Sequence, residues 1–177
     1  MEFNSAALRK LFESRRSIRK YKRAATLEEL RKIVELARLA PSAKNMQPWK
    51  VSLVTDPDLR VKIRDEVCRG REFIAQASLI LIWTEPAIAY KSWRAVDGDN
   101  TADVDAAIFT TYAILAAKSL GLGSCWIAAF DEDKIFDIFP DKKRKYRLFA
   151  ILTVGEPAEE PVPRGRKSVD EIILEER

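Results

Sequence analysis

Hydrophobic positions follow two different spacings along this chain, and the spacing separates expected strands from expected helices. The continuous apolar run Leu79-Ile80-Leu81-Ile82-Trp83 is typical of a central strand whose two faces are both covered. Shorter apolar segments with strand-like composition occur before and after it. We therefore expect strands at residues 49–55, 78–84, 124–128 and 148–154.

Helices are expected where apolar residues recur every three or four positions and where capping residues mark the ends. Thr26 and Glu29 form a capping box, and Ser168 with Glu171 forms a second one near the end of the sequence. Gly121 is the expected C-cap of the longest helix. The expected helices cover 6–14, the stretch from 26 to a stop at 41, a stretch opening at 56–57, 101–120 and 131–136.

Strands and helices follow one another without an internal repeat, a linker or a low-complexity stretch. A chain of 177 residues can bury a core that needs no disulfide or metal support. We expect one domain over residues 1–177, of the α+β class, with a central mixed β-sheet flanked by helices.

Composition removes several kinds of chemistry. The chain has no histidine, which excludes Ser-His-Asp and Cys-His catalysis, zincin metal sites and any histidine acid or base. Cys68 and Cys125 lack a Cys-x-x-Cys spacing and are interpreted as ordinary buried residues of a reduced protein. We expect no metal site, no signal peptide and no membrane span, and hence a cytoplasmic protein.

Charge is modest in total and uneven in distribution. Lys and Arg number 31 and Asp and Glu number 27, and the net charge of +4 is too small to indicate nucleic-acid binding. Basic residues crowd the segment 9–23 and recur at 164–167. Asp103 and Asp105 fall at the start of an expected helix, where carboxylates interact favourably with the helix dipole.

Two motifs near the start carry candidate chemistry. Arg15-Arg16-Ser17-Ile18-Arg19 supplies guanidinium groups and a hydroxyl that suit a phosphate, although a solvated basic helix end would look the same. The segment 41–49 supplies hydrogen-bonding side chains on a proline-braced loop, although it could equally be an ordinary exit from helix to strand. Together the motifs indicate two walls of a pocket for a phosphate-bearing aromatic heterocycle.

These segments resemble the FMN-dependent nitroreductase family. The resemblance rests on Arg-Arg-Ser-Ile-Arg-Lys-Tyr, Ala-Pro-Ser-Ala-Lys-Asn-Met-Gln-Pro-Trp and Gly-Leu-Gly-Ser-Cys-Trp-Ile, in the family's order and spacing, and it covers nearly the whole chain. It implies the nitroreductase-like fold and a homodimer with FMN at the subunit interface, with no nucleic-acid or membrane partner.

The resemblance also implies that each FMN is bound by residues of both subunits. One subunit would supply groups for the phosphate, ribityl chain and pyrimidine edge, namely Arg15, Arg16, Ser17 and Arg19. The other would supply Pro41, Ser42 and Asn45, with Gln47 nearby. A late basic pair would grip the phosphate, Arg164 and Arg166. A strand end formed by Ile127, Ala128 and Ala129 would pass the flavin, and one of its backbone amides would hydrogen-bond to N5. Arg71 is a looser match for a polar or basic group near the ring.

The implied activity is that of an NAD(P)H-dependent oxidoreductase. Hydride would pass from NAD(P)H to FMN N5, and a nitroaromatic, quinone or related acceptor would then enter the same cleft in a ping-pong mechanism. No side chain is expected to be catalytic, and Arg19 would tune the flavin electrostatically. The alternatives are a flavin-binding or flavin-handling protein without NAD(P)H reductase turnover and a reductive dehalogenase-like relative.

Three further features are interpreted more narrowly. Tyr90 and Trp93 lie in the long unpatterned segment 85–100, where they either stack on substrate or anchor the loop. Gly121-Leu122-Gly123 ends a helix and precedes a strand, which indicates a helix cap and not a dinucleotide-binding loop. A small nucleic-acid-binding protein could use the basic segments, but it would leave the loop at 41–49 without a role.

Overall fold

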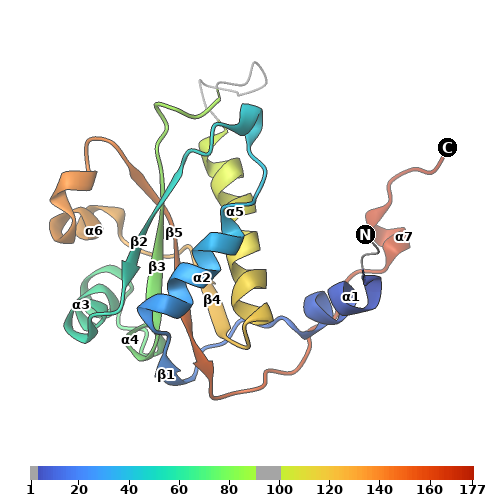
Figure 1. Cartoon of the computed structure of the whole chain (residues 1–177), viewed down its shortest axis with the longest axis horizontal. Helices are drawn as coiled ribbons and strands as arrows, with labels where there is room; N and C mark the ends of the chain where they lie inside the picture. The colour runs from blue at the N-terminus through green and yellow to red at the C-terminus, as the bar shows by residue number, and fades with distance from the viewer. Residues whose placement is uncertain (1–3, 91–100) are drawn as a thin grey trace.

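A five-stranded β-sheet lies between two layers of helices in the computed structural model of the protein (Figure 1). The structure describes residues 4–90 and 101–177. The expected α+β class is confirmed, and so are the four expected strands, the last of them extended by three residues beyond 154. The strands are β1 (Tyr21–Ala24), β2 (Trp49–Val54), β3 (Ser78–Thr84), β4 (Gly123–Ile127) and β5 (Arg147–Pro157).

Strand β5 organises the sheet because it pairs along both of its edges. Val154 pairs with Ser124 of β4 on one edge and with Ser78 of β3 on the other, and β1 continues this second edge beyond β3. Strand β2 pairs with the free edge of β3. The pairings between these strands are antiparallel. Among the described residues, the parallel pairing that makes the sheet mixed, as expected, is a single bridge between Ser17 and Ser124.

The apolar run of β3 is explained by helices on both faces of the sheet. All seven residues of β3 are buried. Leu79, Leu81 and Trp83 belong to the core under one helical layer, whereas the alternate residues Ile80 and Ile82 belong to the core under the other. The prediction of a central strand covered on both sides is therefore confirmed.

Two helices form the first layer, α2 (Leu27–Ala37) and the long α5 (Ala102–Ser119). The capping box of Thr26 and Glu29 is present at the start of α2. Leu120 is the C-cap of α5, and Gly121, the expected cap, follows it with a φ of 77°, a left-handed conformation that favours glycine and ends the helix. Phe109 of α5 stacks on Trp49 at a ring-centroid distance of 5.2 Å, which joins this helix to the start of β2.

The opposite layer consists of short helical pieces. Asp56 and Asp131 cap two of them through their side chains, as expected. The helical pieces of this layer are α3 (Pro57–Lys62), a π-helical turn (Ile63–Val67), α4 (Phe73–Gln76), α6 (Glu132–Ile138) and a 3-10 turn (Pro140–Lys142).

None of the helices in the described ranges combines the length and the apolar run that crossing a membrane requires.

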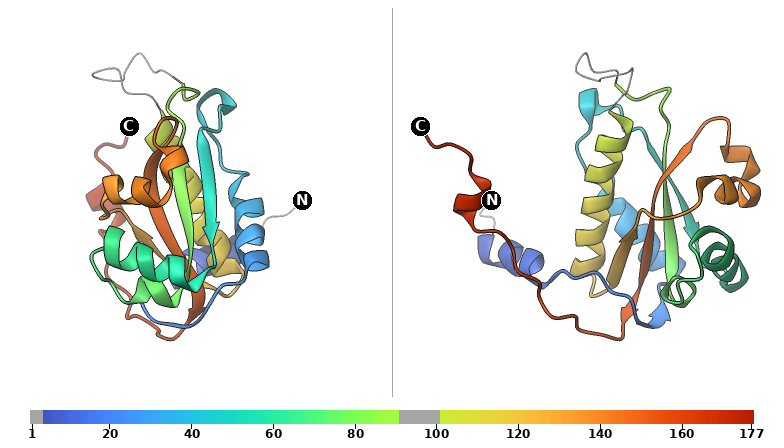
Figure 2. Two further views of the ribbon diagram at one scale, coloured as in Figure 1. Left: turned by 90° about the vertical axis from the view of Figure 1, so that its left-hand side faces the viewer. Right: turned by 180° about the vertical axis from the view of Figure 1, so that it is seen from behind.

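Both ends of the described chain project from this body (Figures 1 and 2). The N-terminal arm is α1 (Ser5–Ser14), none of whose residues is buried. The C-terminal arm is residues 158–177 and contains α7 (Val169–Ile172), and all its residues from 162 onward are exposed. Apolar side chains on the arms are among the exposed ones, including Leu8 at 52% and Leu174 at 100%.

Candidate functional site

The basic motif lies between α1 and β1 and is held against β4. The N–H of Ile18 donates a hydrogen bond to the carbonyl oxygen of Ser124 at 2.9 Å, next to the bridge between Ser17 and Ser124. Ile18 is buried, and a Cβ added to Gly123 would lie 2.8 Å from its Cγ1. Position 123 therefore needs glycine so that the basic motif can approach β4, and the motif is part of the folded body.

Several arginines of this region gather without acidic partners. Burial lowers the pKa of the Arg15 guanidinium, and the charges of Arg166 and then Arg16 lower it further. By contrast, Arg23 pairs with Glu29 at 2.8 Å. A cluster of like charges that forms no close ion pairs favours the binding of an external anion. Within the described ranges, no carboxylate lies within 4.0 Å of the guanidinium groups of Arg15, Arg16, Arg19, Arg71, Arg164 and Arg166.

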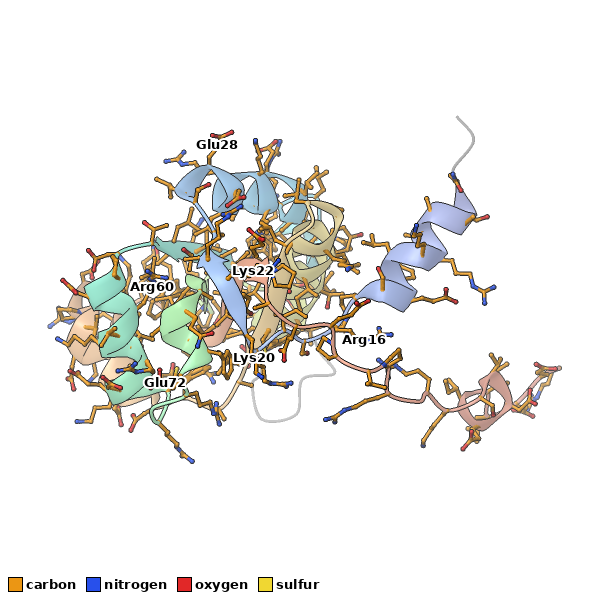
Figure 3. All side chains as sticks on the ribbon, turned by 90° about the horizontal axis from the view of Figure 1, so that it is seen from below. Arg16, Lys20, Lys22, Glu28, Arg60 and Glu72 are labelled. Atoms are coloured by element: carbon orange, nitrogen blue, oxygen red, sulfur yellow. The ribbon has the colours of Figure 1, made fainter. Side chains whose placement is uncertain are left out.

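Arg16 has an unsatisfied donor at the junction between body and arms (Figure 3). Its Nη1 donates to the carbonyl oxygens of Glu13 and Arg15, each at 2.7 Å. Its Nε is buried and has no hydrogen-bond partner. A buried donor without an acceptor costs free energy, so this N–H is available to donate a hydrogen bond to a ligand oxygen.

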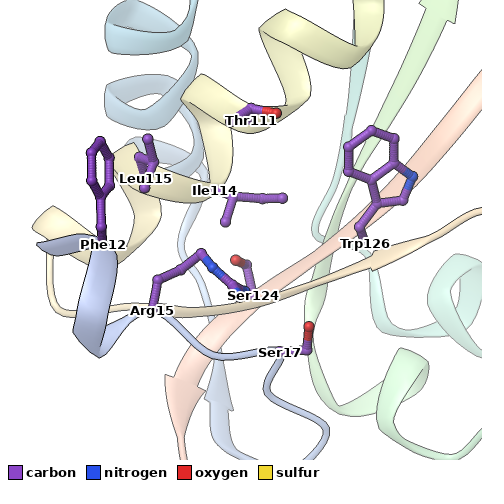
Figure 4. A pocket seen from close by; sticks show the side chains of 8 residues that line it. All are labelled: Phe12, Arg15, Ser17, Thr111, Ile114, Leu115, Ser124 and Trp126. Atoms are coloured by element: carbon purple, nitrogen blue, oxygen red, sulfur yellow. The ribbon is translucent and has the colours of Figure 1, made fainter. Parts of the chain in front are cut away.

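A cavity of about 450 Å³ opens between α1, α5 and β4 (Figure 4). Its polar groups come from the basic motif, from the middle of α5 and from the first half of β4, and its other walls are apolar. The cavity therefore combines Arg15, one of the cations expected for a phosphate, with surfaces that suit an organic ring. Its lining residues are Phe12, Arg15, Ser17, Thr111, Ile114, Leu115, Ser124 and Trp126.

A second cavity, of about 540 Å³, lies at the end of β4 and shares Trp126 with the first. Arg71 Nη1 donates to the carbonyl oxygen of Ala129 at 3.0 Å, which ties this arginine to the strand end. The structure thus brings together the looser expected residue Arg71, Arg19 of the basic motif and the strand end at 127–129. The lining residues are Arg19, Arg71, Phe73, Cys125, Trp126, Ile127, Ala128 and Ala129.

Cys125 lines this second cavity, but it is not an activated nucleophile. Burial raises the pKa of its thiol, and the opposing effects of Arg19 and Ser17 are smaller. A thiol with a raised pKa stays protonated near neutral pH and is a poor nucleophile. The interpretation of Cys125 as an ordinary buried residue therefore stands.

The proline-braced loop has a strained backbone. Lys44, Asn45 and Gln47 have φ values of 51°, 57° and 49°, a left-handed region that residues other than glycine rarely adopt. The Gln47 N–H donates to Ser42 Oγ at 3.0 Å, and Gln47 Nε2 donates to Asn45 Oδ1 at 3.1 Å. Such strain persists only where the surroundings impose it, and it clusters at binding sites. Pro41, Ser42, Asn45 and Gln47 are thus gathered in one shaped loop, as the sequence predicts.

One chain does not bring the two motifs together. The loop at 41–48 lies at the N-terminal end of α5, where the Ala43 N–H bonds to Asp105. The basic motif lies beside β4, which follows the C-terminal end of the same helix (Figures 1 and 2). Asp105, which bonds to the loop, lies about 9–15 Å along the helix axis from Thr111 and Leu115, which line the cavity beside the basic motif. The two motifs therefore occupy separate regions of one chain, and we refer to the loop at 41–48 and the basic motif as the two candidate half-sites.

The remaining expected residues lie near one or other half-site. Tyr90 is 37% exposed, and Lys44 Nζ of the strained loop lies 6.0 Å from its ring centroid. Trp93 lies outside the described residues. Arg166 lies close enough to Arg15 to affect its pKa, and its Nη1 donates to the carbonyl oxygen of Arg164 at 3.1 Å.

Two acidic residues near the half-sites were not recognised from the sequence. The Glu159 carboxylate accepts a hydrogen bond from the backbone N–H of Arg19, across a separation of 140 residues. Asp105 accepts one from the N–H of Ala43. The position of Asp105 on the apolar face of its helix could have revealed such a role. For Glu159 the sequence offers no such signal, because nothing near it in sequence indicates a contact with Arg19.

The chain is similar in sequence to known proteins. A family model described as "Nitroreductase family" matches residues 12–70 and 66–156. The "Oxygen-insensitive NADPH nitroreductase" of Helicobacter pylori is 24% identical over 171 residues, which cover 79% of this chain and 81% of the relative.

Solved structures show the same fold. A nitroreductase family protein from Clostridium difficile superposes with a TM-score of 0.81 at 25% identity, over 100% of this chain and 99% of that one. A protein from Exiguobacterium sibiricum, determined in complex with FMN, superposes with a TM-score of 0.82 at 18% identity, over 95% and 96% of the two chains. The expected nitroreductase-like fold is confirmed, and because the family model matches most of the sequence, this chain belongs to the nitroreductase family.

Proposed function

We propose that the protein is a homodimeric FMN oxidoreductase that passes hydride from NADH or NADPH to a nitroaromatic, quinone or related acceptor by a ping-pong mechanism. An NAD(P)H-dependent oxidoreductase is the activity that its relatives' names carry, such as the NADPH nitroreductase of Helicobacter pylori. The observation that carries the proposal is the arginine cluster, which forms no close ion pairs among the described residues and lies beside two cavities that share Trp126.

The donor set fits a flavin mononucleotide. The phosphate would be held by Arg15 and Arg16 of the basic motif and by Arg164 and Arg166 of the C-terminal arm. Guanidinium groups suit this role because they bind phosphate oxygens through pairs of N–H bonds. Ser17 would add a hydroxyl donor. The cavities of about 450 and 540 Å³ fall within the range typical of small-molecule sites.

The chain's own residues would bind and orient the cofactor. When bound, FMN supplies hydride transfer at N5, so no protein nucleophile or histidine base is required. Arg19 and Arg71 give positive charge to the second cavity, which favours a negatively charged flavin edge there. Through Ala129, Arg71 also fixes the strand end that would face the flavin.

A second copy of the chain would complete the site. The loop with Ser42 and Asn45 would come from the partner, because α5 separates it from the basic motif within one chain. Val104 and Tyr112 of α5 are apolar and yet 62% and 40% exposed, and the arms expose further apolar side chains. A dimer formed over α5 would cover this surface and bring half-sites of different chains together.

Anaerobic reduction tests the proposed activity. We expect the purified protein to show a flavin absorption spectrum that bleaches on addition of NADH or NADPH and returns when a quinone or nitroaromatic is added. Parallel double-reciprocal plots would support the ping-pong order. A flavin spectrum that persists after both reductants would favour a flavin-binding or flavin-handling protein, and a protein that stays colourless with FMN would refute the proposal.

The dimer is expected to be obligate for FMN binding. Wild-type protein should elute at twice the chain mass of 20.2 kDa in size-exclusion chromatography with light scattering. Val104→Glu together with Tyr112→Glu should give a monomer that retains little FMN, because charges would be buried at the interface. Val61→Glu, on α3 in the opposite helical layer, is the control and should leave the dimer intact. An FMN-loaded monomer would contradict the shared site.

Two smaller assignments belong to the same proposal. Cys68 and Cys125 are free thiols in the structure, which fits the reducing environment of the cytoplasm. Tyr90 remains a candidate for stacking on the substrate, and its contact with Lys44 places it beside the loop that would face the flavin.

A further inference from the structure

We propose that Asp105 is a positioning residue, which holds the strained loop at 42–47 in the shape needed to complete the partner's flavin site. The inference rests on the proposed function, since it assigns this loop to the cofactor. From the sequence, an interaction with the helix dipole is sufficient to explain an acidic residue near the start of α5. The structure shows a more specific arrangement.

Asp105 is buried and uses both carboxylate oxygens inside its own chain. The side chain is 2% exposed, on the helix face that also buries Ala102 and Ala106. Its Oδ1 accepts the N–H of Ala43 at 3.0 Å, and its Oδ2 accepts the hydroxyl of Thr101 at 2.8 Å. A charged acceptor makes a stronger bond to a backbone N–H than a neutral one does, so this contact is well suited to fix a loop.

The bonded amide lies where it can resist relaxation of the strain. Ala43 immediately precedes Lys44 and Asn45, two of the residues with positive φ. Without the bond to Asp105, the loop could exchange its left-handed residues for ordinary conformations, because each of those costs free energy. Ser42 and Asn45 would then lose the fixed spacing that binding requires.

The same carboxylate also reaches the candidate substrate residue. Thr101 bonds to Asp105 through its hydroxyl and donates its backbone N–H to the carbonyl oxygen of Tyr90 at 3.0 Å. Lys44, in turn, lies 6.0 Å from the ring of Tyr90. Asp105 therefore connects the flavin-side loop with the segment that carries Tyr90, and it should influence both the cofactor and the acceptor.

Asp105→Ala should raise the dissociation constant for FMN by about tenfold or more, as expected for loss of a charge-assisted hydrogen bond. Asp105→Asn keeps an oxygen acceptor for Ala43 and should restore most of the affinity. Thr101→Val should leave FMN binding nearly unchanged and raise KM for the acceptor without changing the rate of flavin reduction. FMN affinity is measured by fluorescence titration well below the unfolding temperature of each variant.

Hydrogen exchange of the flavin-free dimer gives a readout that does not depend on FMN. Peptides covering 41–48 should exchange faster in Asp105→Ala, with β3 peptides unchanged. Thr110→Val is the matched control, because its buried hydroxyl donates to the carbonyl oxygen of Ala106 within α5 and, among the described residues, to no group of the loop. It should lower stability without altering FMN affinity or loop exchange.

The outcomes separate this inference from the proposed function. A wild-type protein that binds no FMN refutes the function, and exchange at 41–48 then decides the role of Asp105 alone. Unchanged exchange at 41–48 in Asp105→Ala overturns the positioning role, and so does unchanged FMN affinity in a wild-type protein that binds flavin. If Asp105→Ala does not fold, Asp105→Leu provides the same test, because leucine is close to aspartate in size and likewise offers no acceptor to the Ala43 N–H.

Discussion

Replacing both Arg16 and Arg166 with alanine is expected to weaken FMN binding by at least about a hundredfold. Each side chain would give up a charge-assisted hydrogen bond to the phosphate, worth about 1.5–3 kcal/mol. The buried Nε of Arg16, which has no partner in the protein, would lose the role that best accounts for it. FMN titration followed by quenching of flavin fluorescence measures the effect.

The fold should tolerate this double substitution. The charge of Arg166 lowers the pKa of Arg15, so removal of Arg166 relieves repulsion and should not lower the unfolding temperature without FMN. Arg9→Ala with Arg177→Ala is the matched control, since it removes the same charge from the two arms where each arginine pairs with a glutamate. Wild-type affinity in Arg16→Ala/Arg166→Ala would contradict the assigned phosphate site.

Trp83→Ala is expected to produce the largest loss of stability, about 3–5 kcal/mol in the free energy of unfolding. Trp83 is 1% exposed at the end of β3, with ring centroids of Phe136 and Phe139 at 6.1 and 5.9 Å. Its Nε1 also donates to Ser52 Oγ at 2.9 Å. Since domains are stable by about 5–15 kcal/mol in total, the loss would be visible in urea or thermal unfolding.

Ser52→Ala separates the hydrogen bond of Trp83 from its packing. This variant removes only the acceptor of the indole N–H and should cost about 1–3 kcal/mol, less than the loss of the ring itself. Trp83→Phe, which keeps an aromatic ring against Phe136, should fall between the two. A loss below about 1 kcal/mol for Trp83→Ala would mean that β3 is not the centre of the core.

The sequence was sufficient for the strands and caps that depend on local pattern. The run at 79–83 predicted a covered strand because alternate residues have to fill opposite cores. β1 was missed because its Lys22 and Arg23 are exposed and it forms only along the end of β5, a partner far away in sequence. α4 was missed because four residues are too few to show a helical period.

The candidate site was predictable as two motifs but not as an arrangement. Arg15 and Ser42 could be selected by their neighbours in sequence, yet only the fold shows that α5 lies between them. Asp105 was interpreted through the helix dipole because its partner, Ala43, lies 62 residues away. Contacts of this kind arise from tertiary packing, and the spacing of residues within a short segment of sequence does not indicate them.

The position of β5 has a consequence for how the protein is made. β5 pairs with β1, β3 and β4, so most of the sheet waits for residues near the end of the chain. A nascent chain that has emerged only through β4 can form the β2–β3 ladder but lacks β5, the strand that pairs with β1 and β4. Apolar strand edges are then exposed during synthesis until β5 has emerged and pairs with them.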